Sequence, residues 1–138
     1  MSIVVIDTGP LVALLNRRDR FHRWVRDVLQ SVEPPIFTCE PVITETCFLL
    51  REIAAGPDAA LDLLERGILQ IDFHLDAEIA PVRALMKQFA NVPMSLADAV
   101  LVRMTELKRR SVVMTLDDDF RVYRRNRRQP VPTITPNT

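Results

Sequence analysis

The sequence has little of the residues on which several classes of protein depend. Among its 138 residues there are only two cysteines, two histidines and three glycines. Cys39 and Cys47 are too few for a disulfide framework and lack a CxxC spacing, and only His22 and His74 could join them in a zinc site. These scarcities argue against a disulfide-bonded secreted domain and against zinc chemistry, and they fit a reducing cytoplasm.

Long apolar segments are missing as well. No run of apolar residues approaches the length of a transmembrane helix. The first seven residues, Met-Ser-Ile-Val-Val-Ile-Asp, contain no basic segment, and their apolar run stops at Asp7, unlike that of a signal peptide. We therefore expect a cytoplasmic protein with no membrane partner.

The sequence has no excess of charge of either sign. Lys+Arg and Asp+Glu each total 18, so net charge alone indicates neither a nucleic-acid-binding protein nor an enzyme for acidic substrates. The distribution is more informative, because Asp117, Asp118 and Asp119 directly precede a stretch that is rich in arginine and free of acids. The arginines of this stretch are Arg121, Arg124, Arg125, Arg127 and Arg128.

What is present predicts one α/β domain. With 48% apolar residues, residues 1–138 can form one compact core, so we expect a single domain. Apolar runs predict strands at 3–6, 36–39, 68–73 and 112–115, with a short edge strand at 131–134. Helical spacing predicts helices at 10–15, 21–32, 41–54, 57–66, 76–89 and 95–109, with Pro81 either kinking the fifth or delaying its start. Strands separated by helices indicate a three-layer α/β/α sandwich with a central parallel β-sheet.

Four acidic residues fall where such a sheet gathers ligands, outside the carboxyl ends of its strands. Asp7 follows the first strand, Asp117 lies two residues beyond Thr115 at the end of the fourth, and Glu45 lies about one turn into the helix after the second. Asp98 lies in the first turn of the helix that leads into the fourth strand. This helix ends where that strand begins, so it must start at the opposite edge, beside the other acids.

Two of these acids also have a purely structural explanation as helix caps. Asp7 could cap the helix that Pro10 opens, and Asp98 could be the last member of a capping box that begins at Ser95. Asp98 is nevertheless surrounded by apolar residues in a helix that looks buried almost all round. A lone carboxylate in that setting is expected to face a specific partner rather than bulk water.

The other two acids are less certain from the residues alone. Glu45 and Glu52 are seven residues apart and could share a solvated stripe of one helix. Asp117 could belong to a solvated turn with Asp118 and Asp119, and the sequence leaves open which of these three side chains points inward. The joint position of the four acids at one edge favours a shared site.

A cluster of carboxylates indicates a metal site. Two carboxylates about 4 Å apart repel by roughly 1 to 4 kcal/mol, so they stay ionised together only with cations between them. Oxygen ligands favour hard ions such as Mg²⁺ or Mn²⁺. Such ions could activate a water and stabilise the leaving oxygen of a phosphodiester during in-line attack. Neither histidine nor cysteine falls at these positions, which argues against covalent cysteine chemistry.

Four short motifs, in this order, resemble those of PIN-domain proteins, especially the VapC toxins of bacterial toxin–antitoxin pairs. The resemblance spans essentially the whole chain, and it rests on the order of motifs that are individually weak. They are Ile-Val-Val-Ile-Asp7-Thr8-Gly9-Pro10-Leu11 with Asn16 and Asp19-Arg20-Phe21-His22; Thr44-Glu45; Ser95-Leu96-Ala97-Asp98-Ala99; and Val113-Met114-Thr115-Leu116-Asp117-Asp118-Asp119-Phe120.

The resemblance implies a PIN-like fold and a ribonuclease, dependent on Mg²⁺ or Mn²⁺, that cuts single-stranded or loop regions of RNA. It also implies a homodimer and a cognate antitoxin that covers or threads into the acidic groove. Position by position, it makes Asp7 and Asp98 direct metal ligands and Asp117 a direct or water-mediated one. The other matching positions are Glu45, which would orient water at the metal; Thr8 and Thr115, which would support the site by hydrogen bonds; and Asp119, at a less strictly acidic position.

Alternatives remain at this stage. The arginines between Arg121 and Arg128 could hold the phosphates of an RNA backbone, or they could form a merely solvated segment. Glycine at position 9 argues against a haloacid-dehalogenase-type phosphatase, which needs a second aspartate there, and the residue pattern of a receiver domain is missing. A non-catalytic PIN-like binding module and a housekeeping RNA-processing nuclease both stay open.

Overall fold

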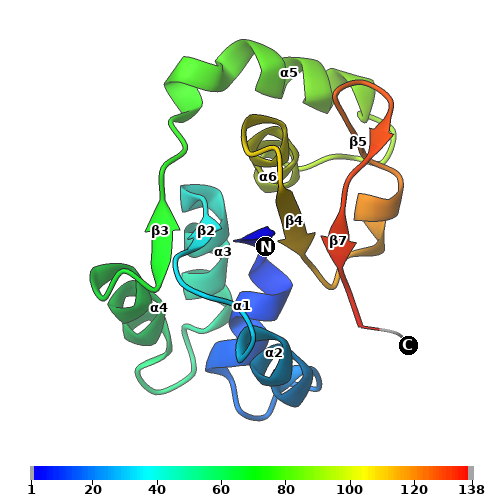
Figure 1. The fold of residues 1–138 in the computed structure, drawn as a ribbon. Helices are drawn as coiled ribbons and strands as arrows, with labels where there is room; N and C mark the ends of the chain where they lie inside the picture. Colours follow the sequence, from blue (N-terminus) through cyan, green and yellow to red (C-terminus); the bar gives the residue numbers. More distant parts are fainter. Residues whose placement is uncertain (1, 137–138) are drawn as a thin grey trace.

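The computed structural model describes residues 2–136 and is built around a five-stranded parallel sheet (Figure 1). The strands are β1 (Ile3–Ile6), β2 (Ile36–Thr38), β3 (Leu69–Ile71), β4 (Ser111–Met114) and β7 (Thr133–Ile134). Their order is β3-β2-β1-β4-β7, and every neighbouring pair is parallel. Because β1 is central, Val4, Val5 and Ile6 are buried, and only Ile3 at its start is exposed. Parallel pairing brings the carboxyl ends of all five strands to one edge.

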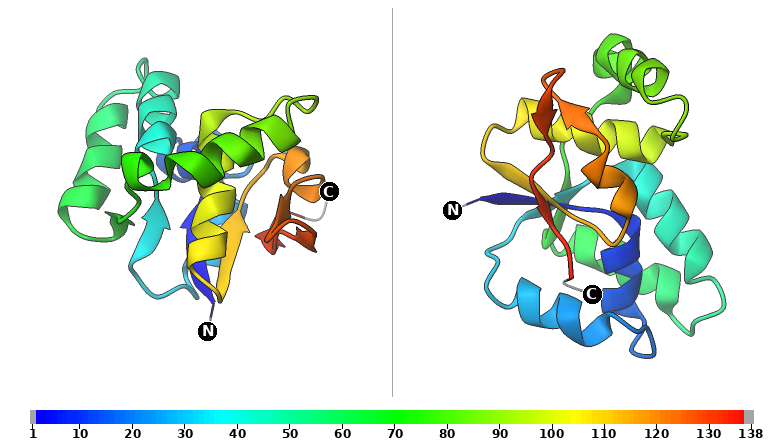
Figure 2. Two further views of the ribbon diagram at one scale, coloured as in Figure 1. Left: turned by 90° about the horizontal axis from the view of Figure 1, so that it is seen from above. Right: turned by 90° about the vertical axis from the view of Figure 1, so that its right-hand side faces the viewer.

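Within residues 2–136, six α-helices connect the strands and cover the sheet. They are α1 (Thr8–Leu15), α2 (His22–Leu29), α3 (Glu40–Leu49), α4 (Gly56–Glu65), α5 (Ile79–Gln88) and α6 (Leu96–Leu107). Helices α5 and α6 lie on one side of the sheet, and α1, α2 and α4 lie on the other (Figures 1 and 2). The predicted α/β/α sandwich with a parallel sheet is therefore confirmed. None of the helices within residues 2–136 is long and apolar enough to cross a membrane.

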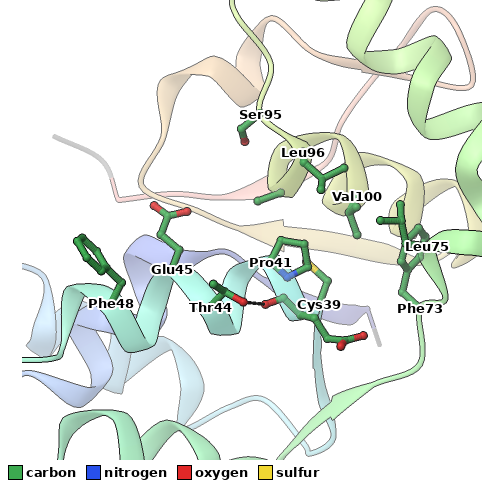
Figure 3. A pocket seen from close by; sticks show the side chains of 12 residues that line it. Cys39, Pro41, Thr44, Glu45, Phe48, Phe73, Leu75, Ser95, Leu96 and Val100 are labelled. Atoms are coloured by element: carbon green, nitrogen blue, oxygen red, sulfur yellow. Dashed lines mark hydrogen bonds between the residues drawn. The ribbon is translucent and has the colours of Figure 1, made fainter.

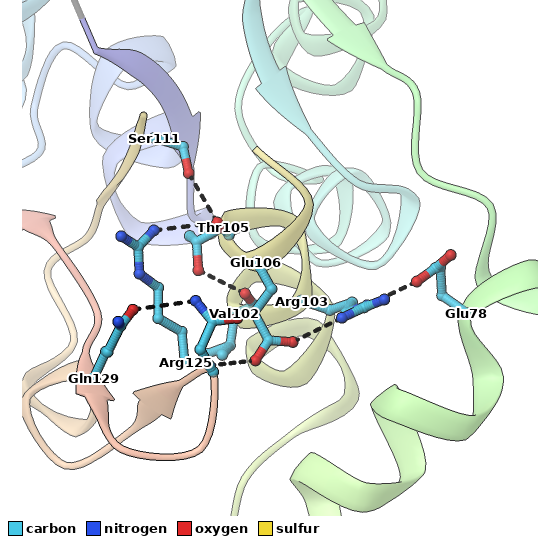
Figure 4. Close-up of polar contacts among 9 residues, drawn as sticks. Glu78, Val102, Arg103, Thr105, Glu106, Ser111, Arg125 and Gln129 are labelled. Atoms are coloured by element: carbon cyan, nitrogen blue, oxygen red, sulfur yellow. Dashed lines mark hydrogen bonds and ion pairs between the residues drawn. The ribbon is translucent and has the colours of Figure 1, made fainter. Parts of the chain in front are cut away.

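The burial of two helices agrees with the apolar patterns in the sequence. Eight of the 12 residues of α6 are buried, and Asp98 is one of them. On α2 and just before it, Trp24 and Phe21 are partly buried and pack against the core, as their apolar spacing predicts. An ion pair attaches α6 to the 3₁₀ turn η1 (Leu75–Glu78), where Arg103 Nε lies 2.7 Å from Glu78 Oε1 (Figure 4).

Several element boundaries differ from those expected. The helix predicted at 41–54 ends at Leu49, and Gly56 is the first residue of α4. Glycine is needed at position 56 because two backbone segments approach closely there: a Cβ added to Gly56 would lie 2.6 Å from the Leu50 carbonyl oxygen. Pro81 falls in the first turn of α5, after η1, where its missing N–H costs nothing. Of the two alternatives for Pro81, a delayed helix start is the one observed.

The arginine-rich segment contains a small hairpin that the sequence analysis did not predict. After the 3₁₀ turn η2 (Asp118–Arg121), strand β5 (Arg124–Arg125) pairs antiparallel with β6 (Gln129–Pro130). The turn between them needs left-handed backbone at Asn126 and Arg127, with φ of 49° and 74°. Asparagine tolerates that conformation but arginine gives no such signal, so this turn is hard to recognise in the sequence.

Candidate metal centre

A cleft of about 480 Å³ opens at the carboxyl edge of the sheet, and all four predicted acids line it. It is formed by the ends of β1 and β4 and by the first turns or exposed faces of α1, α3 and α6. The lining residues with side-chain oxygens are Asp7, Thr8, Glu45, Ser95, Asp98, Asp117 and Asp119. The structure therefore brings the four predicted acids together at one edge of the sheet.

Asp7 joins the first strand to the first helix and is 7% exposed. One carboxylate oxygen accepts a hydrogen bond from the Thr8 backbone N–H at 2.7 Å, so Asp7 does cap α1. The other accepts from the Thr115 hydroxyl at 2.7 Å, which fixes the carboxylate at the end of β4. The pKa of Asp7 is raised to about 6: burial raises it most, the charges of Asp98 and Asp117 also raise it, and the two hydrogen bonds oppose these effects. Capping and a position in the cleft are thus compatible.

Asp98 lies in the first turn of α6 and is 8% exposed. Its backbone N–H donates to the Ser95 hydroxyl at 3.1 Å, which is half of the capping box considered above. Its carboxylate, however, accepts a 2.6 Å hydrogen bond from the hydroxyl of Tyr123. Burial raises the pKa of Asp98, and the bond from Tyr123 opposes this effect. Its carboxylate is therefore engaged in tertiary structure.

The acidic turn after β4 separates its three aspartates. The Asp117 N–H donates to the Thr115 hydroxyl at 3.0 Å, and the Asp119 N–H donates to Asp117 Oδ1 at 2.9 Å. These bonds place Asp117 and Asp119 in the cleft, whereas the Asp118 side chain is 90% exposed. The sequence left open which of the three faces inward, and the structure places two of them there.

Carboxylate oxygens of Asp98, Asp117 and Asp119 all lie within 4.8 Å of one another. None of the ion pairs formed within residues 2–136 involves these three acids or Asp7. At such separations each pair of like charges costs roughly 1 to 4 kcal/mol. An all-oxygen cluster without a basic partner is the donor set that suits a hard divalent cation, and these residues fit one.

Glu45 lies at the rim of the cleft, on α3, and its side chain is exposed. The Thr8 hydroxyl is 3.4 Å from Glu45 Oε2, at the long limit for a hydrogen bond. Glu45 and Ser95 also border a neighbouring apolar pocket (Figure 3). Glu45 is thus less firmly held than the three clustered aspartates.

None of the five arginines between Arg121 and Arg128 is among the described residues that line the cleft. The Arg125 guanidinium donates to the Thr105 carbonyl at 3.2 Å, and the next residue bonds to Glu106 (Figure 4). Glu106 is eight residues after Asp98, or about 12 Å further along α6. Arg124 is engaged as well, because its guanidinium donates to three backbone carbonyls. The Arg125 side chain therefore lies toward the far end of α6, whereas the Arg124 side chain folds back onto the backbone of residues 121–123.

Arg121, Arg127 and Arg128 are exposed. Of these, Arg121 is close to the acidic turn, with its Nε 3.8 Å from Asp118 Oδ1 in a solvent-exposed pair. Contact of these three residues with RNA remains a prediction.

Tyr123 is a residue of the site that the sequence analysis missed. It is the only tyrosine in the chain, and it lies 25 residues from its hydrogen-bond partner Asp98. The sequence signal that was available is weak: a single tyrosine, four residues after Asp119, in an otherwise arginine-rich stretch.

Comparison with known proteins identifies the family. A model of the PIN domain matches residues 4–126, so the chain belongs to the PIN-domain family, whose members are nucleases. No curated protein sequence shows a significant match.

Solved structures agree in fold. The chain is similar to the sarcin-ricin-loop-cleaving toxin VapC20 of Mycobacterium tuberculosis, with a TM-score of 0.74, 22% identity and coverage of 84% of this chain and 91% of that one. It is also similar to VapBC2 of Rickettsia felis bound to promoter DNA, with a TM-score of 0.64, 12% identity and coverage of 98% and 99%. The third similar structure is FitAcB of Neisseria gonorrhoeae, with a TM-score of 0.55, 16% identity and coverage of 83% of this chain and 88% of that one. At these identities the likeness establishes the fold.

Proposed function

We propose that this protein is a ribonuclease that depends on Mg²⁺ or Mn²⁺ and serves as the toxin of a VapBC-type toxin–antitoxin pair. The observation that carries the proposal is the gathering of Asp7, Asp98, Asp117 and Asp119, without a basic partner among residues 2–136, in one cleft of a PIN fold. PIN nucleases usually use divalent metals. The similar toxin VapC20 cleaves RNA at the sarcin-ricin loop, which favours RNA as the substrate class.

In this proposal Asp98, Asp117 and Asp119 hold the cation together with Asp7. A divalent cation bound there supplies Lewis acidity, which activates an attacking water and stabilises charge on the phosphodiester in the transition state. Thr115 fixes the Asp7 carboxylate and the acidic turn at once, because its hydroxyl donates to Asp7 and accepts from the Asp117 N–H. Asp119 is here proposed as a metal ligand, although the resemblance places it at a less strictly acidic position of the last motif.

The remaining proposed roles concern proton transfer and support. Glu45, exposed at the rim, orients the attacking water, whose oxygen adds to phosphorus as the bond to the leaving ribose oxygen breaks. The water gives its proton to Glu45 or to solvent, and the leaving ribose oxygen takes a proton from solvent. Thr8 contributes its hydroxyl to Glu45 and its backbone N–H to Asp7.

Cleavage of total RNA tests the enzymatic part. We would incubate the protein with RNA in Mg²⁺, in Mn²⁺ and in EDTA, beside two matched variants. Asp98→Asn changes a buried acid of the cluster, and Asp118→Asn makes the same change at an exposed acid of the adjoining turn. We expect discrete, metal-dependent products from the wild type and from Asp118→Asn, and none from Asp98→Asn. Identical patterns in all three proteins, or no effect of EDTA, would contradict the proposal and favour a binding module.

An antitoxin partner is supported by the apolar surface beside the acidic cleft. Phe48 and Leu49 on α3 are 59% and 50% exposed, and Phe48 and Leu96 line the apolar pocket of about 760 Å³ (Figure 3). Solvent-exposed patches of this kind mark protein-binding surfaces. Similar folds occur in the toxin–antitoxin complexes VapBC2 and FitAcB.

The partner proposal is tested by co-expression with the product of an adjacent short reading frame. We expect a stable complex in which RNA cleavage is suppressed, and Phe48→Ser should weaken the complex without reducing cleavage by the free protein. The predicted homodimer can be measured in the same preparation by light scattering. If no adjacent reading frame encodes a binding partner, a housekeeping nuclease becomes the better assignment.

A further inference from the structure

Tyr123 carries a buried hydroxyl whose described partner is a carboxylate of the metal centre. The side chain is fully buried, and its hydroxyl donates to Asp98 Oδ2 at 2.6 Å. This distance is typical of a strong hydrogen bond to an ionised oxygen. A tyrosine that served only to fill the core would be replaced at no loss by phenylalanine, so the position of this hydroxyl needs an explanation.

The ring of Tyr123 is held by two aromatic neighbours from different elements. Phe89, which follows α5, and Phe120, in η2, both meet it edge to face, with centroid distances of 5.3 Å and 5.1 Å. Their interplanar angles of 67° and 84° are those that aromatic quadrupoles favour. These aromatic contacts therefore hold the ring in place independently of the hydrogen bond to Asp98.

The backbone after Tyr123 is attached to the same helix that carries Asp98. The Arg125 guanidinium donates to the Thr105 carbonyl, and the Asn126 N–H donates to Glu106 Oε2 at 2.6 Å (Figure 4). Helix α6 thus presents Asp98 at its beginning and anchors the β5–β6 hairpin near its end. The attachment of the hairpin to α6 therefore fixes the position of Tyr123 relative to Asp98.

We propose that Tyr123 is a positioning residue for metal binding, holding the Asp98 carboxylate so that it presents an oxygen to the cation beside Asp117 and Asp119. The inference rests on the proposed metal-dependent function. With Oδ2 accepting from the phenol, the carboxylate cannot rotate freely about its terminal torsion, and the proposal assigns its other oxygen to the cation. Hydrogen-bond partners of metal-ligating carboxylates contribute about 10- to 100-fold to metal affinity.

Binding of Mn²⁺ alone, without RNA, tests this role. Tyr123→Phe removes one oxygen and keeps the ring in place. Thr105→Val is the matched control, because it deletes another fully buried hydroxyl of the same region, one that bonds to the Val102 carbonyl at 2.6 Å. By calorimetric titration we expect Tyr123→Phe to bind Mn²⁺ about 10- to 100-fold more weakly than the wild type. Thr105→Val should bind Mn²⁺ with wild-type affinity, while both variants unfold at somewhat lower temperatures.

The opposite result is equally clear. If Tyr123→Phe binds Mn²⁺ as tightly as the wild type and differs only in thermal stability, Tyr123 is a core residue and the inference is overturned. If the wild type itself binds no Mn²⁺, the proposed function fails first and the inference fails with it. These two outcomes are distinguished by the wild-type titration.

A measurement on the wild type keeps the test valid if Tyr123→Phe does not fold. Because Tyr123 is the only tyrosine, the tyrosine band of the near-ultraviolet difference spectrum reports on its hydroxyl. We expect saturating Mn²⁺ to perturb this band with the same dissociation constant as the calorimetric titration. A flat tyrosine region at saturation overturns the inference.

Discussion

Replacing Asp7 by asparagine should stabilise the metal-free protein at neutral pH, although Asp7 is proposed to be a metal ligand. The side chain is 7% exposed, and burial raises its pKa from 3.8 to about 6. The folded chain therefore binds a proton more readily than the unfolded chain between about pH 4 and pH 6. Over this window the free energy of unfolding falls as the pH rises, and above the folded-state pKa the whole penalty of the buried charge is present.

The size of the penalty follows from the shift in pKa. The difference between about 6 and 3.8 is about two units, and at 1.36 kcal/mol per unit it corresponds to about 3 kcal/mol. Asparagine removes the charge, but its single carbonyl oxygen can accept from only one of Thr8 and Thr115. A buried donor that loses its acceptor costs about 1 to 3 kcal/mol, which the mobile Thr115 hydroxyl can reduce by turning. We therefore expect a net gain of about 1 to 2 kcal/mol.

Urea unfolding in EDTA at several pH values measures this effect. The stability difference between Asp7→Asn and the wild type should be smallest near pH 4 and should reach its full value above pH 6.5. In saturating Mg²⁺ the wild type should become the more stable of the two proteins, because Mg²⁺ at 100 times its dissociation constant adds about 2.7 kcal/mol to the free energy of unfolding of the wild type. The reasoning is refuted if Asp7→Asn is less stable than the wild type in EDTA at pH 7.5 and the difference does not change with pH.

Three further predictions concern the other acids, the exposed arginines and a buried thiol. Asp119→Asn should weaken Mn²⁺ binding by about tenfold or more, because it removes one charge from the cluster; wild-type affinity would exclude Asp119 as a ligand. Replacing Arg121, Arg127 and Arg128 by alanine should weaken RNA binding. The slope of log affinity against log salt concentration should become shallower by up to about 0.7 for each lost phosphate contact, and an unchanged slope would argue against contacts with the RNA backbone. Burial raises the pKa of Cys39 to about 12, so this thiol should resist modification in the folded protein and react only after denaturation; rapid labelling of Cys39 itself, rather than of the partly buried Cys47, in the native protein would contradict this.

Much of the fold could be predicted because its signals are local. The run Ile3–Ile6 is β-branched throughout, and such a run predicts a strand buried on both faces, as β1 is from Val4 onward. Once strands and helices alternate, right-handed crossovers bring the strand ends to one edge, which placed Asp7 and Asp117 together without any side-chain detail. Boundaries were less predictable, as at Gly56, where a close contact with the Leu50 carbonyl rather than a helix stop explains the glycine.

The sequence by itself determined that carboxylates gather at the carboxyl edge of a parallel sheet, because strand ends and helix starts follow from the pattern of apolar residues. Only the tertiary structure decided which carboxylates point inward and what holds them. Asp118 and Asp119 are equivalent in sequence, and they differ because the Asp119 N–H bonds to Asp117 and turns its side chain to the cleft. Tyr123 reaches Asp98 through contacts between distant segments. Such contacts depend on packing, which no local pattern in the chain encodes.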